Sequence, residues 1–309
     1  MKNDMKTAFL FPGQGAQIVG MGKDVAEAFP LAAEIFKKAN GLLGFDLSKI
    51  CFEGPAEQLN TTAISQPAIF TASAAILEVI KGNLRPDVTA GLSLGEYTAL
   101  YAAGVISFED TLILVQKRGQ AMQAAADATE GGMVSIIGLD EKKVNELCAE
   151  AAEGELLVAA NFNCPGQIVI SGSKTACQRA ESLAPKYGAI KTLRLEVAGA
   201  FHTEMMASAT EAISGASLKS KIAEPSDIKI IANINADYYQ NAEEIIKGLK
   251  EQLTSPVLWQ KCMERLLADG VEKFYEIGPG KVLTGLMKRI NRRTEVINVS
   301  NLEAVKQLC

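Results

Sequence analysis

The strongest constraint on the fold is the pentapeptide Gly-Leu-Ser-Leu-Gly at residues 91–95. A Gly-x-Ser-x-Gly sequence fits a sharp turn between a strand and a helix, which lifts the serine hydroxyl out of the backbone. The flanks suit this geometry, because residues 87–90 after Pro86 are typical of a short buried strand and residues 95–103 of a helix. The two glycines are expected where strand and helix approach too closely for side chains. The pattern therefore predicts a strand–turn–helix unit with Ser93 at its apex.

The chain contains a single histidine, His202, within Gly-Ala-Phe-His-Thr. A serine nucleophile at neutral pH needs a general base, which is usually a histidine. A lone histidine is more often structural, so two interpretations are open for this residue. Its occurrence beside a Gly-x-Ser-x-Gly turn, with no competing imidazole, favours catalysis. The helix after Ser93 would also direct its first backbone amides to the place where an oxyanion would develop.

Composition and charge limit the class of protein. The 309 residues are 48% hydrophobic and 22% charged, which is typical of a soluble globular protein. The net charge of −5 argues against nucleic acid as the main partner. Six cysteines without a Cys-x-x-Cys pair argue against zinc and against a disulfide framework, and suit a reducing cytosol. We expect no secretion signal before Pro12 and no apolar run that approaches a membrane span.

Strand-like and helical segments alternate along most of the chain, which favours a largely parallel α/β sheet. The expected strands of this part lie at 6–11, 87–90, 228–234 and 271–277, and the expected helices at 23–40, 65–81, 95–103, 107–128, 204–217, 241–253, 256–268 and 281–291.

A separate order of elements begins after Glu-Gly-Gly at residues 130–132. The expected elements are strand 133–138, helix 140–152, strands 156–161 and 167–171, helix 173–185 and strand 189–197. This β-α-β-β-α-β order is that of a split βαβ unit. We therefore predict that residues 131–198 form a small domain inserted into a large α/β catalytic domain of residues 1–130 and 199–309.

Several other polar residues have both a functional and an ordinary interpretation. Gly13-Gln14-Gly15 follows the first expected strand, where α/β proteins place ligand-binding turns, but an ordinary strand–helix turn has the same composition. It is not a phosphate loop, because no Gly-Lys-Ser/Thr follows. Arg118 follows a lysine and would suit a solvated helix face. Gln252, Asn161 and Asn163 would pass for surface or turn residues when read alone.

Seven short segments in one order carry a resemblance to a known family. They are Phe-Pro-Gly-Gln-Gly-Ala-Gln at 11–17, Gly-Leu-Ser-Leu-Gly-Glu-Tyr at 91–97, Gln-Lys-Arg-Gly-x-x-Met at 116–122, Asn-x-Asn-x-Pro-Gly-Gln at 161–167, Ala-Phe-His at 200–202, Ser-Pro-Val-x-Trp at 255–259 and Glu-Ile-Gly-Pro-Gly at 276–280. In order and spacing, over essentially the whole chain, the set resembles the malonyl-CoA:acyl-carrier-protein transacylases, of the acyltransferase family of fatty acid and polyketide synthesis. The resemblance implies a hydrolase-like α/β core with a ferredoxin-like insert.

The resemblance also implies roles in catalysis. Ser93 is similar to the nucleophile that becomes acylated, and His202 to its general base. The backbone amides of Gln14 and Leu94 would form the oxyanion hole. The backbone carbonyl of Gln252 would orient the histidine, where a hydrolase would use an aspartate.

Other positions are similar to the family's substrate-binding residues. Arg118 would pair with the free carboxylate of the malonyl group, since a guanidinium matches a carboxylate bidentately. Phe201 would crowd the carbon next to the thioester, and Asn161 and Asn163 would also bind substrate. One position departs from the pattern, because many members carry histidine immediately before the serine and this chain has Leu92. The chain is thereby left with one imidazole.

The resemblance implies malonyl-CoA and a phosphopantetheinylated acyl carrier protein as partners, without a metal or organic cofactor. Carrier proteins are acidic, so docking on this chain of net charge −5 needs a local basic surface. The densest basic cluster consists of Lys288, Arg289, Arg292 and Arg293, with Lys281 shortly before it. These charges would equally complement a helix C-terminus, so the cluster has an ordinary interpretation too. We expect a cytoplasmic, monomeric protein that binds neither nucleic acid nor membrane.

Two other classes of function stay open. A serine esterase or thioesterase would use the same Ser93 and His202 pair, although such enzymes place the histidine late in the chain and no matching acid is evident. A protein that binds CoA or a carrier without catalysis would not need both residues.

Overall fold

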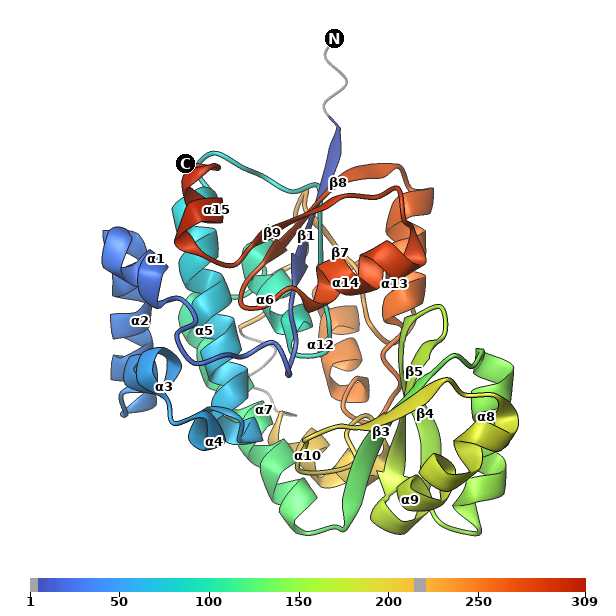
Figure 1. Cartoon of the computed structure of the whole chain (residues 1–309). Coiled ribbons are helices and arrows are strands. Elements are labelled where there is room, and N and C mark those ends of the chain that lie inside the picture. The colour runs from blue at the N-terminus through green and yellow to red at the C-terminus, as the bar shows by residue number, and fades with distance from the viewer. Residues whose placement is uncertain (1–4, 214–220) are drawn as a thin grey trace.

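The computed structural model describes residues 5–213 and 221–309, and its strands form two separate sheets (Figure 1). The larger sheet has five strands in the order β7-β2-β1-β8-β9. All of its neighbouring strands pair in parallel. The strands are β1 (Lys6–Phe11), β2 (Val88–Gly91), β7 (Lys229–Ile230), β8 (Val271–Ile277) and β9 (Val296–Val299).

Strand β1 shows why this sheet is buried on both faces. Phe9 and Phe11 belong to the apolar cluster that includes the helices on one face, and Ala8 and Leu10 belong to a second cluster on the other. A continuous apolar run is typical of a parallel strand that is covered on both sides. The predicted largely parallel α/β core is therefore confirmed.

The smaller sheet is antiparallel, with the order β4-β5-β3-β6. Its elements follow the chain as β3 (Gly131–Ile137), α8 (Glu141–Ala152), β4 (Leu157–Cys164), β5 (Gln167–Ser173), α9 (Lys174–Leu183), a short 3-10 helix (Ala184–Tyr187) and β6 (Lys191–Arg194). This order and strand arrangement match the predicted ferredoxin-like unit. Its helices pack on the sheet through an apolar cluster of their own.

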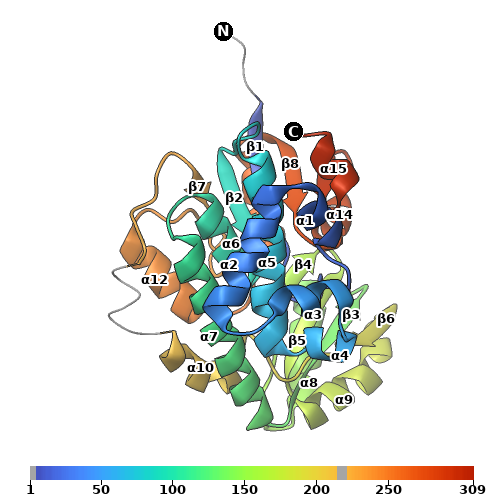
Figure 2. The same cartoon turned by 90° about the vertical axis from the view of Figure 1, so that its left-hand side faces the viewer.

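The helices of the larger part lie on both sides of its sheet (Figure 1), and Figure 2 faces the side that carries α2 and α5. They are α1 (Lys23–Ala28), α2 (Pro30–Leu43), α3 (Leu47–Glu53), α4 (Ala56–Leu59), α5 (Thr62–Ile80), α6 (Gly95–Ala102), α7 (Phe108–Asp127), α10 (Ala207–Ala212), α12 (Ala242–Glu251), α13 (Trp259–Ala268), α14 (Val282–Ile290) and α15 (Leu302–Lys306). Helices α13 and α14 also contact β4, so they join the larger part to the smaller sheet.

Several expected boundaries were wrong. The helix expected at 23–40 is two helices, because Phe29 is extended and Pro30 begins α2. The strand expected at 228–234 is reduced to β7, since the chain turns back at the isolated bridge between Ile231 and Tyr238. The helix expected at 204–217 begins as a 3-10 turn (Glu204–Met206) and continues as α10, and positions 214–217 lie outside the described residues.

Helix α5 corrects the expectation that no apolar run approaches a membrane span. In the part of the chain that the structure describes, this one helix is long and apolar enough to cross a membrane, judged by length and composition. However, 78% of its apolar window is buried inside the molecule, where α5 packs against α2 and α7. A buried core helix passes the same test, so α5 is weak evidence for a membrane.

The arrangement of the two sheets determines where a site can form. The beginning of β1 and the C-terminal helix α15 lie at one end of the molecule, and β1 runs from there toward the smaller sheet (Figure 1). The carboxyl ends of parallel strands are the usual position of ligand sites in α/β folds. Here the turns after β1 and β2 face strands of the smaller sheet across a cavity.

Candidate active site

Ser93 lies in the predicted sharp turn between β2 and α6. Its φ angle is +51°, in the left-handed region that a non-glycine residue adopts at a cost. A Cβ on Gly91 would lie 1.8 Å from the backbone carbon of Gly95, and a Cβ on Gly95 would lie 2.1 Å from the carbonyl oxygen of Phe11. Only glycine fits at either position, which explains both glycines of the pentapeptide.

Asn233 holds this turn from both sides. The backbone N–H of Ser93 donates to Asn233 Oδ1 at 2.7 Å, and Asn233 Nδ2 donates to the carbonyl oxygen of Gly91 at 2.8 Å. These bonds stabilise the strained conformation of the turn and keep the Ser93 hydroxyl pointed away from the sheet. No local pattern in the sequence singles out Asn233, which follows β7 and lies 140 residues after Ser93.

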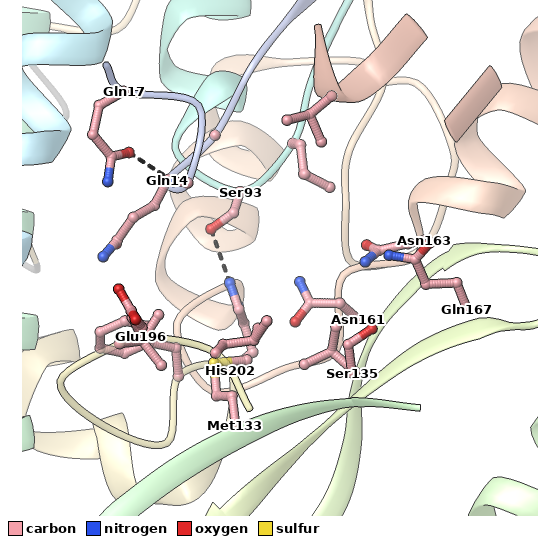
Figure 3. A pocket seen from close by; sticks show the side chains of 18 of the residues that line it. Gln14, Gln17, Ser93, Met133, Ser135, Asn161, Asn163, Gln167, Glu196 and His202 are labelled. Atoms are coloured by element: carbon pink, nitrogen blue, oxygen red, sulfur yellow. Dashed lines mark hydrogen bonds between the residues drawn. The ribbon is translucent and has the colours of Figure 1, made fainter. Parts of the chain in front are cut away.

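His202 contacts the Ser93 hydroxyl directly (Figure 3). Its Nε2 lies 2.8 Å from Ser93 Oγ, and its Nδ1 lies 2.8 Å from the backbone carbonyl oxygen of Gln252. A carbonyl oxygen only accepts, so Nδ1 carries the proton and Nε2 offers its lone pair to the serine. Burial, followed by the charge of Arg118, lowers the pKa of His202 to about 4. The imidazole is therefore neutral at pH 7 and able to act as a base.

Arg118 is buried behind the serine, which contradicts the interpretation as a solvated helix face. It is 1% exposed, and its guanidinium packs over the ring of Tyr97 at 5.2 Å. Nη1 donates to Gln66 Oε1 at 2.8 Å, and Nη2 donates to Gln252 Oε1 at 2.9 Å and to Ser93 Oγ at 3.1 Å. Within the described residues, no carboxylate forms an ion pair with this guanidinium.

Gln252 connects the base, the arginine and the nucleophile turn. It is fully buried, although it would pass for a surface residue in the sequence. Besides its bonds to His202 and Arg118, its side-chain Nε2 donates to the backbone oxygen of Ser93 at 3.0 Å and to Glu96 Oε2 at 2.7 Å. Glu96 is itself fully buried. Burial raises the pKa of its carboxyl to about 7, against the hydrogen bonds that lower it.

The serine and histidine open into a cavity of about 450 Å³ between the two parts of the molecule. Of the residues singled out in the sequence, those that line it are Gly13, Gln14, Gly15, Leu92, Ser93, Asn161, Asn163, Phe201 and His202. Figure 3 labels Gln14, Ser93, Asn161, Asn163 and His202 among them. Apolar side chains complete the wall, among them Met122, Met133 and Val169. No group of three or more His, Cys, Asp or Glu side chains in the described residues could hold a metal ion.

The two backbone amides predicted for the oxyanion hole flank the nucleophile region. Gln14 follows β1, and its side chain is tied by a hydrogen bond of 3.3 Å to Thr62. Leu94 follows Ser93, and its side chain is buried. Neither backbone N–H donates to an acceptor in residues 5–213 or 221–309. Both are therefore free to donate to a bound group.

The predicted docking residues divide into three sets along α14. Lys288, Arg292 and Arg293 line a shallow groove at the C-terminal end of the helix. Lys281 lies at the N-terminal end of α14. The helix has nine residues and is roughly 13 Å long at a rise of ~1.5 Å per residue. Arg289 donates to Gln167 Oε1 at 3.0 Å and to the backbone oxygens of Pro165 and Gly166, so it fastens α14 to the turn between β4 and β5.

Comparison with known proteins agrees with this geometry. Residues 8–305 match the family model described as acyl transferase domain. The chain is 45% identical to the malonyl CoA-acyl carrier protein transacylase of Bacillus subtilis over 303 residues, which cover 97% of this chain and 95% of the relative. It is 44% identical to the Escherichia coli protein of the same name over 285 residues, 92% of each chain.

Solved structures agree with the sequence relatives. An acyl carrier protein S-malonyltransferase from Vibrio cholerae has a TM-score of 0.93 and 42% identity, covering 98% of this chain and 100% of its own. A malonyl-transacylase in complex with a type II PKS acyl-carrier protein has a TM-score of 0.93 and 39% identity, covering 98% of each chain. The resemblance read from the seven sequence segments is thus confirmed, and the chain belongs to the acyl transferase domain family.

Proposed function

We propose that this protein transfers the malonyl group of malonyl-CoA to the phosphopantetheine thiol of an acyl carrier protein, through a malonyl ester on Ser93. The observation that carries the proposal is the hydrogen bond from Arg118 to Ser93 Oγ. It places a buried guanidinium without a carboxylate partner beside the nucleophile, where an acyl group with a free carboxylate would gain an ion pair. The relatives in Bacillus subtilis and Escherichia coli are named for the same acyl group.

The first half-reaction begins at the hydrogen bond between Ser93 and His202. Ser93 Oγ attacks the thioester carbonyl while Nε2 of His202 accepts the hydroxyl proton. The carbonyl oxygen becomes an oxyanion, to which the backbone amides of Gln14 and Leu94 donate. The C–S bond then breaks, and His202 returns the proton to the sulfur of CoA. General base assistance of this kind is typically worth ~10²–10⁴-fold in rate.

The second half-reaction uses the same groups with a different thiol, which makes the mechanism ping-pong. The pantetheine thiol of the carrier protein gives its proton to His202, and its sulfur attacks the ester carbonyl on Ser93. The C–O bond breaks, and the proton moves from His202 to Ser93 Oγ. The product is a malonyl thioester on the carrier protein, an extender unit for fatty acid synthesis.

The cavity suits a pantetheine arm leading to the serine. Asn161 and Asn163 line it from β4, and Asn163 Oδ1 is buried without a hydrogen-bond partner in the described residues. An amide N–H of the arm would satisfy that oxygen. Phe201 lines the cavity next to His202, and we propose that its ring restricts branching at the carbon beside the thioester.

We assign carrier-protein docking to the basic groove of Lys288, Arg292 and Arg293, with Lys281 at the cavity end of α14. Val282, the residue after Lys281, lines the cavity, so α14 leads from the groove to the site. Arg289 has a different role in this proposal, because its hydrogen bonds join α14 to the β4–β5 turn.

We also propose that residues 131–198 are an insert in a catalytic domain of residues 1–130 and 199–309. The close approach of Gly131 and Ala200 supports this division, since a Cβ on Gly131 would lie 2.6 Å from the Ala200 nitrogen. The chain thus enters and leaves the insert at neighbouring points. We propose a monomeric cytoplasmic enzyme that needs no metal or organic cofactor and binds neither nucleic acid nor membrane.

A serine esterase or thioesterase is the alternative that shares the Ser93 and His202 pair. Mass spectrometry of the intact protein after mixing with malonyl-CoA separates the candidates. A stable malonyl adduct on Ser93 supports the transferase, and rapid release of free malonate supports a hydrolase. An unmodified protein with intact malonyl-CoA would contradict both.

A further inference from the structure

The site has a serine and a histidine, and no carboxylate of residues 5–213 or 221–309 forms a hydrogen bond with the histidine. In a Ser-His-Asp triad, the aspartate bonds to Nδ1 and stabilises the imidazolium that forms during the reaction. Here Nδ1 of His202 faces the backbone oxygen of Gln252, which carries only a partial charge. Arg118 adds a positive charge that lowers the pKa of His202 further. The backbone groups of Gln252 and Ser255 favour the imidazolium but are outweighed by burial and Arg118, so a nearby negative charge would stabilise it further.

Glu96 is a buried carboxylate that hydrogen bonds connect to this site. It lies on α6, three residues after the nucleophile, and is fully buried. Its Oε2 accepts from Gln252 Nε2 at 2.7 Å and from the backbone N–H of Asn233 at 3.2 Å. Its Oε1 accepts from the hydroxyl of Tyr239. Three donors from separate segments thus converge on one carboxylate.

The carboxylate determines which way the Gln252 amide points. At one end of the amide, Oε1 accepts from Arg118, and at the other, Nε2 donates to Glu96. A reversed amide would set its NH₂ against the guanidinium and its oxygen against the carboxylate. Both ends would then face a group of the same hydrogen-bonding type. Glu96 and Arg118 together therefore hold Gln252 in one orientation.

Glu96 also supports the nucleophile turn. Glu96 accepts a hydrogen bond from the backbone of Asn233, and the side chain of Asn233 in turn bonds to the backbones of Gly91 and Ser93. The side-chain amide of Gln252, which Glu96 orients, donates to the backbone oxygen of Ser93. Ser93, His202 and Arg118 are thus each one hydrogen-bonded residue away from Glu96.

We propose that Glu96 is a positioning residue that takes the place of the missing triad acid, acting on His202, Arg118 and Ser93 through Gln252 and Asn233. It holds Gln252 in place for its bond to His202, and its negative charge acts through space to stabilise the imidazolium that forms as Ser93 loses its proton. This inference rests on the proposed function for the identity of the reaction. It adds a requirement for an ionised Glu96.

The surroundings of Glu96 make its ionisation measurable. Its titratable and charged neighbours are Tyr97 on α6, Arg118 on α7, Tyr239 in the segment before α12, and Cys262 on α13. Burial raises the pKa of Glu96 to about 7, whereas that of His202 is lowered to about 4. A step in activity near pH 7 would therefore belong to Glu96, with the ionised form more active.

The test is the single-turnover rate of Ser93 malonylation by malonyl-CoA between pH 5 and 9, for wild type, Glu96→Gln and Tyr239→Phe. Glutamine at position 96 keeps an oxygen for Gln252 and Asn233 and can donate its NH₂ to Tyr239, so the variant removes chiefly the charge. We expect the wild-type rate to rise through pH 7. The Glu96→Gln rate should show no such step and should stay about 10-fold below wild type at pH 8, with KM for malonyl-CoA not raised.

Tyr239→Phe removes one donor from the ionised carboxylate and keeps the bond to Gln252. The step should therefore move to higher pH in this variant. A Glu96→Gln enzyme that acylates at the wild-type rate, or that keeps the step at the same pH, would overturn the inference. An activity step that stays at the wild-type pH in Tyr239→Phe would also overturn it. This second result can be measured even if Glu96→Gln folds poorly. A wild-type protein that forms no malonyl ester at any pH would instead refute the proposed function.

Discussion

Arg118 donates a hydrogen bond to the nucleophile Ser93 across 3.1 Å while being 1% exposed. A buried guanidinium without a carboxylate partner is costly, because burial removes the water that would otherwise solvate its charge. Nη1 and Nη2 also donate to the neutral oxygens of Gln66 and Gln252, and the buried Nε has no hydrogen-bond partner among the described residues. In the proposed function, the carboxylate of the substrate would supply the charge that pairs with this guanidinium.

Arg118→Ala should impair malonyl transfer and spare, or even favour, acetyl transfer. Without the guanidinium, a malonyl carboxylate would be partly desolvated and unpaired, at a cost of about 2–5 kcal/mol. Arg118→Lys keeps the charge but loses the fork, so we expect an intermediate result. The measurement is kcat/KM with malonyl-CoA and with acetyl-CoA. Equal losses for the two substrates would mean that Arg118 only supports the fold.

Phe201 is expected to exclude branched acyl groups. The wild-type enzyme should use methylmalonyl-CoA poorly, and Phe201→Ser should improve its use. A methyl group in such a pocket is worth only ~1–3 kcal/mol, so the gain in the ratio of kcat/KM values should be modest. A wild-type enzyme that used methylmalonyl-CoA as well as malonyl-CoA would refute the steric role.

Reversing the charges of Arg292 and Arg293 to glutamate should raise KM for the carrier protein. Added salt should weaken the wild-type interaction in the same way, because exposed charges are screened. Transfer to free pantetheine, which has no acidic surface, should change little. Reversing two exposed lysines away from the groove, Lys37→Glu on α2 and Lys142→Glu on α8, gives the same change in net charge and is the control. If both acceptors respond alike, or neither responds, the groove is not the docking site.

Glu96→Gln should change how stability depends on pH. The pKa of Glu96 is about 7 in the folded protein and 4.5 for an unperturbed carboxyl, so between these values the folded state holds a proton that the unfolded state has released. Proton binding by Glu96 therefore stabilises the folded wild-type protein at low pH, and this stabilisation is lost as the pH rises from 4.5 to about 7. Relative to wild type, the variant should gain roughly 3 kcal/mol in free energy of unfolding between pH 5 and 8.

Urea unfolding of the two proteins at both pH values measures that difference. His202 has the opposite effect, because its pKa is lowered on folding and the unfolded state binds the extra proton. Both proteins contain His202, so its contribution cancels in the comparison. A difference between the proteins that stays constant with pH would show that Glu96 does not titrate in this range.

The local sequence pattern was sufficient to predict elements that have a continuous apolar run or a glycine-dependent turn. The β1 strand and the Gly91–Gly95 turn are examples, since their residues alone limit the backbone. Elements without such signals were missed, such as β9 (Val296–Val299), whose side chains are mostly only half-buried. The division at Pro30 did have a signal in the sequence, because the residue before a proline is disfavoured in the helical conformation, and Phe29 is extended.

The site was predictable where a residue type has few ordinary uses, as for the serine of the turn and the single histidine. Arg118 and Gln252 were ambiguous when read alone, because burial is a property of what packs against a helix. The carboxylate network was not found for the same reason. Glu96, Asn233 and Gln252 come from distant segments, and only the tertiary fold brings them together.

The most direct test of the central claim is a chase experiment on the acylated enzyme. Enzyme treated with malonyl-CoA and freed of excess reagent is mixed with a carrier protein that bears a pantetheine thiol. We predict that malonyl leaves Ser93 and appears on the carrier in equal amount, that Ser93→Ala forms no adduct, and that His202→Ala forms it at least ~10²-fold more slowly. Malonyl that stays on another residue in the Ser93→Ala variant, or that is lost to water rather than to the thiol, would contradict the account.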